Sequence, residues 1–537
     1  MSGAVPGSGD PGLPVYRLGE QRAGTALFGL AMPQVLLVAA AAAAVLLPVS
    51  SGGGRLGFFA GMVTAAGLGL LAFFPAGGRP LHEMVPTVGA FAWRWATGRH
   101  RWAAPLPLLT GTASTTAGAG RSDAPTTEAL PRCLSGLSLV AVARPDWAGG
   151  SRTVAPVGLV RDRGTSAVTV VVPVRGGPFS LAEPGERHRR LLEWAQVLSQ
   201  FARESSPVVR LGWSLWSAPT SLDEHLDWVD AHSADGDGDR GPAGDVRVAY
   251  RRLVADAASA SWRHDLRLWL TVDARRVERS GASRTAPDAA AADIALAAAK
   301  ALSDRCGAAG LIVFPPMSPV EIAEAARAQA DPAAAAALTG VRRGLAQRAG
   351  LASVHAIHAG PLAVEARWDA LRVDGAWHRV FWVAQWPALA VDADWLEPLL
   401  LAPPCVRALA VVMEPISLRA SRRRINSESV SIEGQLHLRE RHAFRVPVHL
   451  QRAHAEVDQR EAELHAGFCE YGYLALVCVT GRDLGELDAG CHALIDQAAQ
   501  CGITELRPVW GRQEAAWACT LPIGRAPDRR LLDGRLS

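Results

Sequence analysis

The 537-residue sequence predicts a two-helix transmembrane hairpin followed by mixed α/β (α+β) domains. Two observations support this fold class. Long uncharged segments occupy the N-terminal part of the chain, whereas short apolar runs alternate with helical periodicities over the rest of it. The composition, with 49% apolar and 20% charged residues, is that of a chain able to bury a large core.

Two apolar segments predict the N-terminal hairpin. Between Arg22 and Arg55 the chain has 32 residues without a charged side chain, and between Arg55 and Arg79 it has another 23. Since about 20 apolar residues cross the hydrocarbon core of a bilayer, each segment is long enough for one helix. The first helix is expected near residues 25–49, and the sequence SSGGG at 50–54 predicts the turn. A signal peptide is the alternative for the first segment, but it leaves the second unexplained.

The arginines that flank this hairpin predict its orientation. Only Arg55 lies in the connecting turn. The short flanks outside the hairpin carry six arginines, which are Arg17, Arg22, Arg79, Arg94, Arg99 and Arg101. Because positively charged flanks stay on the cytoplasmic side, both termini and the large C-terminal part are expected in the cytoplasm. The chain is therefore expected in the plasma membrane, in contact with inner-membrane lipid.

Residues 79–104 follow the hairpin and are rich in tryptophan and arginine. Pro86, Val88 and Phe91 fall roughly on one helical face, which predicts an amphipathic elbow helix on the inner leaflet. Five residues are candidate anchors in the headgroup region, namely Trp93, Trp95, Trp102, Arg94 and Arg99. A helix that docks on the following domain is the alternative.

The rest of the chain contains recurring strand and helix patterns. Val168–Val174 is a β-branched run, and Leu191, Ala195 and Leu198 repeat at helical spacing. The polar stretch 418–460 is predicted to be helical in its second half. The expected segments are a cytoplasmic tail (1–22), the hairpin (23–78), the elbow (79–104), a linker rich in Pro, Gly, Ser and Thr (105–131), and two cytoplasmic α/β regions (132–345 and 346–537), the second ending in a strand-helix-strand unit.

No motif in the sequence predicts catalysis. The only lysine, Lys300, follows Ala299, so no glycine-lysine pair is present to form a P-loop. The sequence also lacks a CxxC pair, an HExxH helix and a GxSxG elbow. We therefore assign no catalytic, cofactor-binding or metal-ligating residue and do not expect an enzyme.

One charged cluster is a candidate docking site. It consists of Arg419, Arg422, Arg423 and Arg424. Aromatic residues are not interleaved with these arginines, so the cluster does not support direct nucleic-acid binding. A solvated face or a contact with an acidic protein partner is expected instead.

Three stretches carry a resemblance to a known family. They are FSLAEPGERHRRLLEWAQVLSQFARE (179–204), PPMSPVEIAEAARAQADPAAAA (315–336) and the C-terminal GRQEAAWACTLPIGR (511–525). With the hairpin and elbow, they resemble an actinobacterial family of integral membrane proteins of conjugative elements. The C-terminal arrangement is similar to the non-motor N-terminal region of VirB/TrbE/CagE type IV secretion ATPases, and the hairpin is similar to a PrgI-type membrane subunit.

This resemblance implies a membrane-anchored, non-catalytic scaffold of a conjugation or type IV secretion-like channel. Its implied partners are other channel subunits and a separate P-loop ATPase. Two alternatives stay open: an EccE-like membrane component of type VII secretion, and a membrane-bound enzyme whose active site is not readable from the sequence. The transported substrate, and whether the chain forms a homo-oligomer, also stay open.

Overall fold

The structure is a computed structural model. It describes residues 32–50, 54–76, 79–104, 130–142, 156–177, 179–220, 225, 229, 242–279, 287–333, 360–387, 391–401, 403–441 and 445–527. The expected tail (1–22) lies outside the described residues, as does nearly all of the expected linker.

Two apolar helices form the N-terminal hairpin, α1 (Met32–Ser50) and α2 (Gly54–Phe73). They pack closely, because a Cβ added at Gly61 would meet the backbone carbonyl of Ala44. The Gln34 side-chain amide also donates to the Ala72 carbonyl at 3.2 Å. Of the described helices, only α2 is both long and apolar enough to cross a membrane, judged by length and composition. The apolar part of α1, Met32–Pro48, is shorter.

A short connection leads from the hairpin to the sheet. The strands β1 (Pro75–Ala76) and β2 (Arg79–Pro80) pair with each other and precede helix α3 (Leu81–Ala96). The chain then forms β3 (Arg101–Ala103), which pairs with the large sheet. The expected elbow helix is thus corrected: it ends at Ala96, and the end of the segment is a strand.

The 13-stranded sheet is built from two similar series of elements. The first contains β4 (Leu137–Val142), β5 (Val157–Asp162), β6 (Ala167–Arg175), α4 (Pro184–Ser199), β7 (Val208–Pro219), α6 (Pro242–Ala260), β8 (Trp262–Asp273), α7 (Ala274–Arg279), α8 (Pro287–Ala308), β9 (Ile312–Val313) and α9 (Pro319–Ala330). The 3₁₀ turn η2 (Arg132–Leu134) precedes it.

The second series repeats this plan. It contains β10 (Ala363–Ala366), β11 (Leu371–Val373), β12 (Ala376–Gln385), α12 (Glu397–Leu401), β13 (Val406–Pro415), α13 (Leu418–Arg441), α14 (Val448–His465), β14 (Tyr471–Gly481), α15 (Leu484–Gln500), β15 (Glu505–Pro508) and α16 (Gln513–Thr520). Its α13 and α14 occupy the place that α6 has in the first series.

The strand order reveals an approximate two-fold relation between the two series. After β3 the order is β10-β11-β12-β14-β13-β7-β8-β6-β5-β4. Read from the two ends of this series towards the centre, corresponding strands of the two halves follow in the same order. The short strand β9 pairs with β6, just as β15 pairs with β12. The central pair β7 and β13 joins the halves, with Val411 opposite Trp213. Residues 132–345 and 346–537 therefore share one sheet.

Every pair of neighbouring strands described here is antiparallel. The strands and helices alternate along the chain as expected, yet the fold is a mixed α+β fold rather than a parallel α/β sheet. Alternation alone predicts a parallel sheet. Here each connecting helix returns the chain antiparallel to a neighbouring strand.

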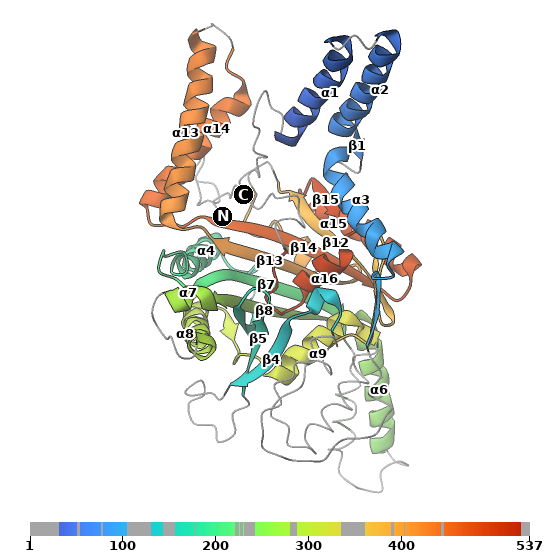
Figure 1. The fold of residues 1–537 in the computed structure, drawn as a ribbon. Coiled ribbons are helices and arrows are strands. Elements are labelled where there is room, and N and C mark those ends of the chain that lie inside the picture. The colour runs from blue at the N-terminus through green and yellow to red at the C-terminus, as the bar shows by residue number, and fades with distance from the viewer. Residues whose placement is uncertain are drawn as a thin grey trace.

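One face of the sheet packs against α4, α8, α12 and α15 (Figure 1). Val170 and Leu270 are buried on this side of β6 and β8, and Ala295, Leu399 and Leu494 fill the space from the helices. The apolar stripe of each helix and the alternate residues of each strand meet in this core.

The other face packs against α9 and α16, which connect the two halves (Figure 1). The end of α9 reaches the β11–β12 turn, where Arg327 bonds to Asp374 and the Asp331 carboxylate accepts from Gly375 N at 3.0 Å. In the same way, the segment after α16 in the second series contacts the β5–β6 turn of the first series through Arg525. Each half therefore contributes a segment that packs on a turn of the other half.

Helices α13 and α14 form an arm that projects from the sheet (Figure 1). Ile425, Ile432, Leu450, Ala453 and Val457 make a small separate core between them. The prediction of a helix in the second half of 418–460 is confirmed by α14, and the first half is helical as well, since α13 begins at Leu418. Although α13 is mostly polar, it has a narrow apolar stripe, and this stripe packs against α14 alone.

Candidate functional site at the junction of hairpin and sheet

Helix α3 docks on the sheet domain through one face. Phe91 meets Trp368 edge to face, with ring centroids 5.3 Å apart. Arg94 donates to the Gly511 carbonyl and lies 3.7 Å from the Glu514 carboxylate. Burial lowers the pKa of Arg94, and Glu514 opposes this effect. The helix that follows the apolar hairpin is therefore fixed to the N-terminal end of α16.

The five predicted membrane anchors divide into two groups. Trp93 and Trp95 are 66% and 65% exposed, and Arg99 is exposed as well. Arg94 instead belongs to the docked face. Trp102 lies in β3 opposite Val364 and packs on the core beneath α9 and α16. The interpretation of Arg94 and Trp102 as lipid anchors is therefore corrected: both side chains contact the sheet domain.

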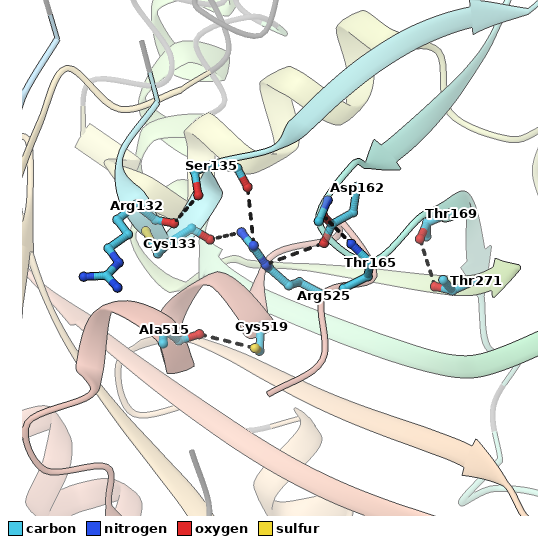
Figure 2. A network of polar contacts seen from close by, with 11 residues as sticks. Arg132, Cys133, Ser135, Asp162, Thr165, Thr169, Thr271, Ala515, Cys519 and Arg525 are labelled. Carbon is cyan, nitrogen blue, oxygen red and sulfur yellow. Dashed lines mark hydrogen bonds and ion pairs between the residues drawn. The ribbon is translucent and has the colours of Figure 1, made fainter. Parts of the chain in front are cut away.

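The C-terminal segment ties η2 and the β5–β6 turn to α16. Figure 2 shows the Arg525 side chain lying between η2 and Asp162. It donates to the Cys133 carbonyl and, at 3.4 Å, to that of Ser135, and its Nε lies 4.0 Å from the Asp162 carboxylate. Glu514 accepts from Cys133 N at 3.2 Å. Glu514 therefore contacts both α3 and η2, which lie on either side of the 105–131 segment.

The Leu-Pro-Ile-Gly end of the sequence has a structural role here. Gly524 has a φ of +67°, a conformation that residues with a side chain rarely adopt. A Cβ there would also lie 2.6 Å from the Thr169 hydroxyl, which bonds to the Thr271 hydroxyl at 2.8 Å. Only glycine lets the chain pass this close to β6. The glycine of the Leu-Pro-Ile-Gly sequence is therefore required by a close approach between two backbone segments.

Gln513 begins α16 and is buried, with 1% of its surface exposed. Its side-chain oxygen accepts from Val380 N at 2.7 Å, and its amide donates to the Val380 carbonyl at 3.4 Å. The side chain thus acts as a short strand that satisfies the backbone of β12. Gln513 lies in the stretch 511–525 that carries the sequence resemblance, but its role needed the structure.

The described cysteines are poorly suited to nucleophilic chemistry. All eight are free, and six are buried. Burial raises the pKa of the Cys478 and Cys519 thiols to about 12 and that of Cys133 well above its usual value. A reactive cysteine needs a thiolate, which these environments disfavour. Within the described ranges, no group of three or more His, Cys, Asp or Glu residues could hold a metal ion.

The predicted docking arginines lie on the first turns of α13. Arg422 and Arg423 are exposed. Arg419 pairs with Glu204 at 3.5 Å, and Arg424 pairs with Glu428 at 3.6 Å. The helix places all four at the base of the α13–α14 arm, where α13 leaves the sheet.

His378 is a buried histidine that links α9 to β12. Its Nε2 donates to the Ala330 carbonyl at 2.9 Å, so its Nδ1 accepts from the Thr480 hydroxyl at 3.0 Å. The Asp331 carboxylate acts on its charge, and the centroid of the Trp517 ring lies 5.9 Å from that of the His378 ring. Burial lowers the pKa of His378 to about 4, although Ala330 and Asp331 act in the opposite direction.

Acid is expected to weaken the domain through His378. The unfolded histidine binds a proton near pH 6.5, whereas the folded one does so only near pH 4. Its contribution is fully present above pH 6.5 and is lost as the pH falls towards 4. At pH 5 the loss is about 2 kcal/mol. Urea unfolding of the purified protein between pH 7.5 and 5 measures it.

His378→Gln should remove most of this pH slope, and His492→Gln is the matched control because His492 is exposed. Equal slopes in the wild type and His378→Gln would contradict the assignment.

No protein-family model matches this chain, and no curated protein matches it either. The site therefore has to be interpreted from its own geometry.

Proposed function

We propose that this protein is a membrane-anchored, non-catalytic scaffold of a conjugation or type IV secretion-like channel. In this role its cytoplasmic sheet domain docks a separate ATPase. One observation supports the proposal most: the segment after the apolar hairpin is built into the sheet domain. β3 pairs with β10, and Arg94 of α3 bonds to Gly511 and Glu514. Such a rigid attachment of the sheet domain to the hairpin suits a component that holds partners at a fixed position on a membrane.

The proposal includes the membrane topology. In the proposed topology α2 crosses the plasma membrane, and α1 crosses together with the uncharged residues that precede it, since the uncharged segment of the sequence begins at residue 23. The termini lie in the cytoplasm, because six flanking arginines oppose one in the turn. The exposed tryptophans of α3 then lie nearest the inner headgroups. The close packing at Gly61 supports a paired hairpin, since small residues let membrane helices approach each other.

Cysteine labelling of intact cells tests this topology. Ser50→Cys, at the exposed end of α1, should react with a membrane-impermeant maleimide added outside. Thr165→Cys, in the exposed β5–β6 turn, should react only after the cells are opened. The wild type gives the background of the native thiols. Labelling of Thr165→Cys in intact cells would reverse the proposed orientation.

The arginine cluster on α13 is the proposed docking site for the ATPase. Its exposed charges lie at the base of the arm, where an acidic partner surface has access to them. Exposed charges act mainly on the association rate, and salt screens them. They contribute little to folding stability.

Reversal of Arg422, Arg423 and Arg424 to glutamate should therefore reduce ATPase recruitment. The expected loss is about tenfold or more at low salt and is smaller at high salt. The measurement is co-purification of the ATPase from membranes at both salt concentrations.

Glutamate at Arg251, Arg252 and Arg276 gives the same change in charge on other helices and should leave recruitment unchanged. If the Arg422–Arg424 variant retains the full yield of ATPase, the cluster is not the docking site. If even the wild type retains none, the scaffold proposal itself fails.

A further inference from the structure

The two-fold relation between the halves of the sheet is broken at its edges. At one end β10 pairs with β3, with Val364 opposite Trp102. The counterpart of β10 in the first half is β4, and β4 ends the sheet. Of the strands that the structure describes, only β5 pairs with β4.

Within the described part of the chain, β4 is an edge strand without the usual protection against pairing. Its sequence LSLVAV contains no charged residue and no proline, and its six residues are all half-buried. Natural edge strands usually carry lysine, proline or a bulge, which prevent pairing with other chains. The side chains of β4 already pack on the two cores, since Leu139 contacts the core beneath α9 and α16, and Val140 contacts the core beneath α4 and α8. What the edge offers is its row of backbone N–H and C=O groups.

Among the described residues, one strand from outside the two series, β3, covers an edge of this sheet. β3 is bound to β10. An antiparallel pair of identical strands is self-complementary, because a two-fold axis places each N–H opposite a C=O of the same sequence.

We propose that two copies of this protein associate through β4, which pairs antiparallel with β4 of the second copy and continues the sheet across a two-fold axis. The interaction is strand addition at a sheet edge, with main-chain hydrogen bonds as its basis. It is independent of the proposed secretion role.

Light scattering of the full chain in detergent tests the association. A protein mass of twice 56.7 kDa is expected. A monomer at all concentrations would overturn the proposal.

Single cysteines at each of positions 137–142 then locate the axis. Oxidation should give covalent dimers at the one or two positions nearest the axis, with yields that fall on both sides, because paired strands bring only those Cα atoms to disulfide distance. A dimer that none of the six positions crosslinks above the wild-type background would overturn the assignment to β4.

A charged edge provides the second arm of the test. Ser138→Lys combined with Ala141→Lys should raise the dimer dissociation constant about tenfold or more, since like charges then face each other across the axis. Thr165→Lys, on the exposed β5–β6 turn, is the control and should leave the constant unchanged. Thermal melting must show that the variants stay folded, and the cysteine scan does not depend on them. An unchanged constant in the folded double variant would overturn the proposal.

Discussion

Gly212→Ala is expected to lower the free energy of unfolding of the sheet domain by about 3 kcal/mol or more. Gly212 lies in β7, in the middle of the sheet, opposite Trp269 of β8. The Trp269 indole is 1% exposed and lies over Gly212, so an added Cβ would overlap its ring. The same Cβ would lie 2.6 Å from the Val411 carbonyl on the neighbouring strand.

This cost cannot be relieved locally, because interiors are close-packed and a buried indole has no other space. Chemical denaturation of the purified protein measures it. Gly472→Ala is the matched control, since Gly472 is also a strand glycine and the nearest atom to its added Cβ is 4.0 Å away. The control should change stability by less than about 1 kcal/mol. If both variants are equally stable, the tight contact at Trp269 is wrong.

Asp374→Ala is expected to cost about 3–5 kcal/mol, because it removes the partner of a buried charge. The side chains of Arg327 and Asp374 are 4% and 9% exposed, and they join α9 to the β11–β12 turn. Asp374 also accepts from Leu362 N at 2.8 Å and from Ala363 N at 2.7 Å. Without this carboxylate, the buried Arg327 guanidinium loses the ion-pair partner that joins it to the turn.

A double variant distinguishes the buried charge from a general weakening of the turn. Arg327→Met combined with Asp374→Asn removes both charges and keeps a side chain that accepts hydrogen bonds from the turn. It should be more stable than Asp374→Asn alone by about 1 kcal/mol or more, and this comparison keeps the same residue at a position whose φ is +51°. Denaturation midpoints at equal slope give the comparison. A double variant as unstable as the single one would contradict the role of the ion pair.

The predicted site was only partly accessible from the sequence. Trp93, Trp95 and Arg99 are exposed, as a membrane-facing interpretation requires. Arg94 and Trp102 are residues of the same types in the same segment, but they contact Glu514 and β10. Tryptophan and arginine mark amphipathic positions without saying which apolar surface they meet.

The sequence by itself determined the local elements. The apolar length of α2, the helical stripe of α4 and the β-branched run of β6 are patterns within one segment, so each can be recognised without a partner.

Only the tertiary structure decided how these elements are joined. Strand pairing is a contact between residues that are distant in the sequence. No single segment therefore specifies the antiparallel strand order or the two-fold arrangement. β3, with three residues, and β11, with three, are too short to carry a period. Gln513, Gly524 and Asp374 acquire their roles from backbone groups of other segments. The shape of the junction is therefore set by long-range contacts, because local patterns specify which faces are buried but not what covers them.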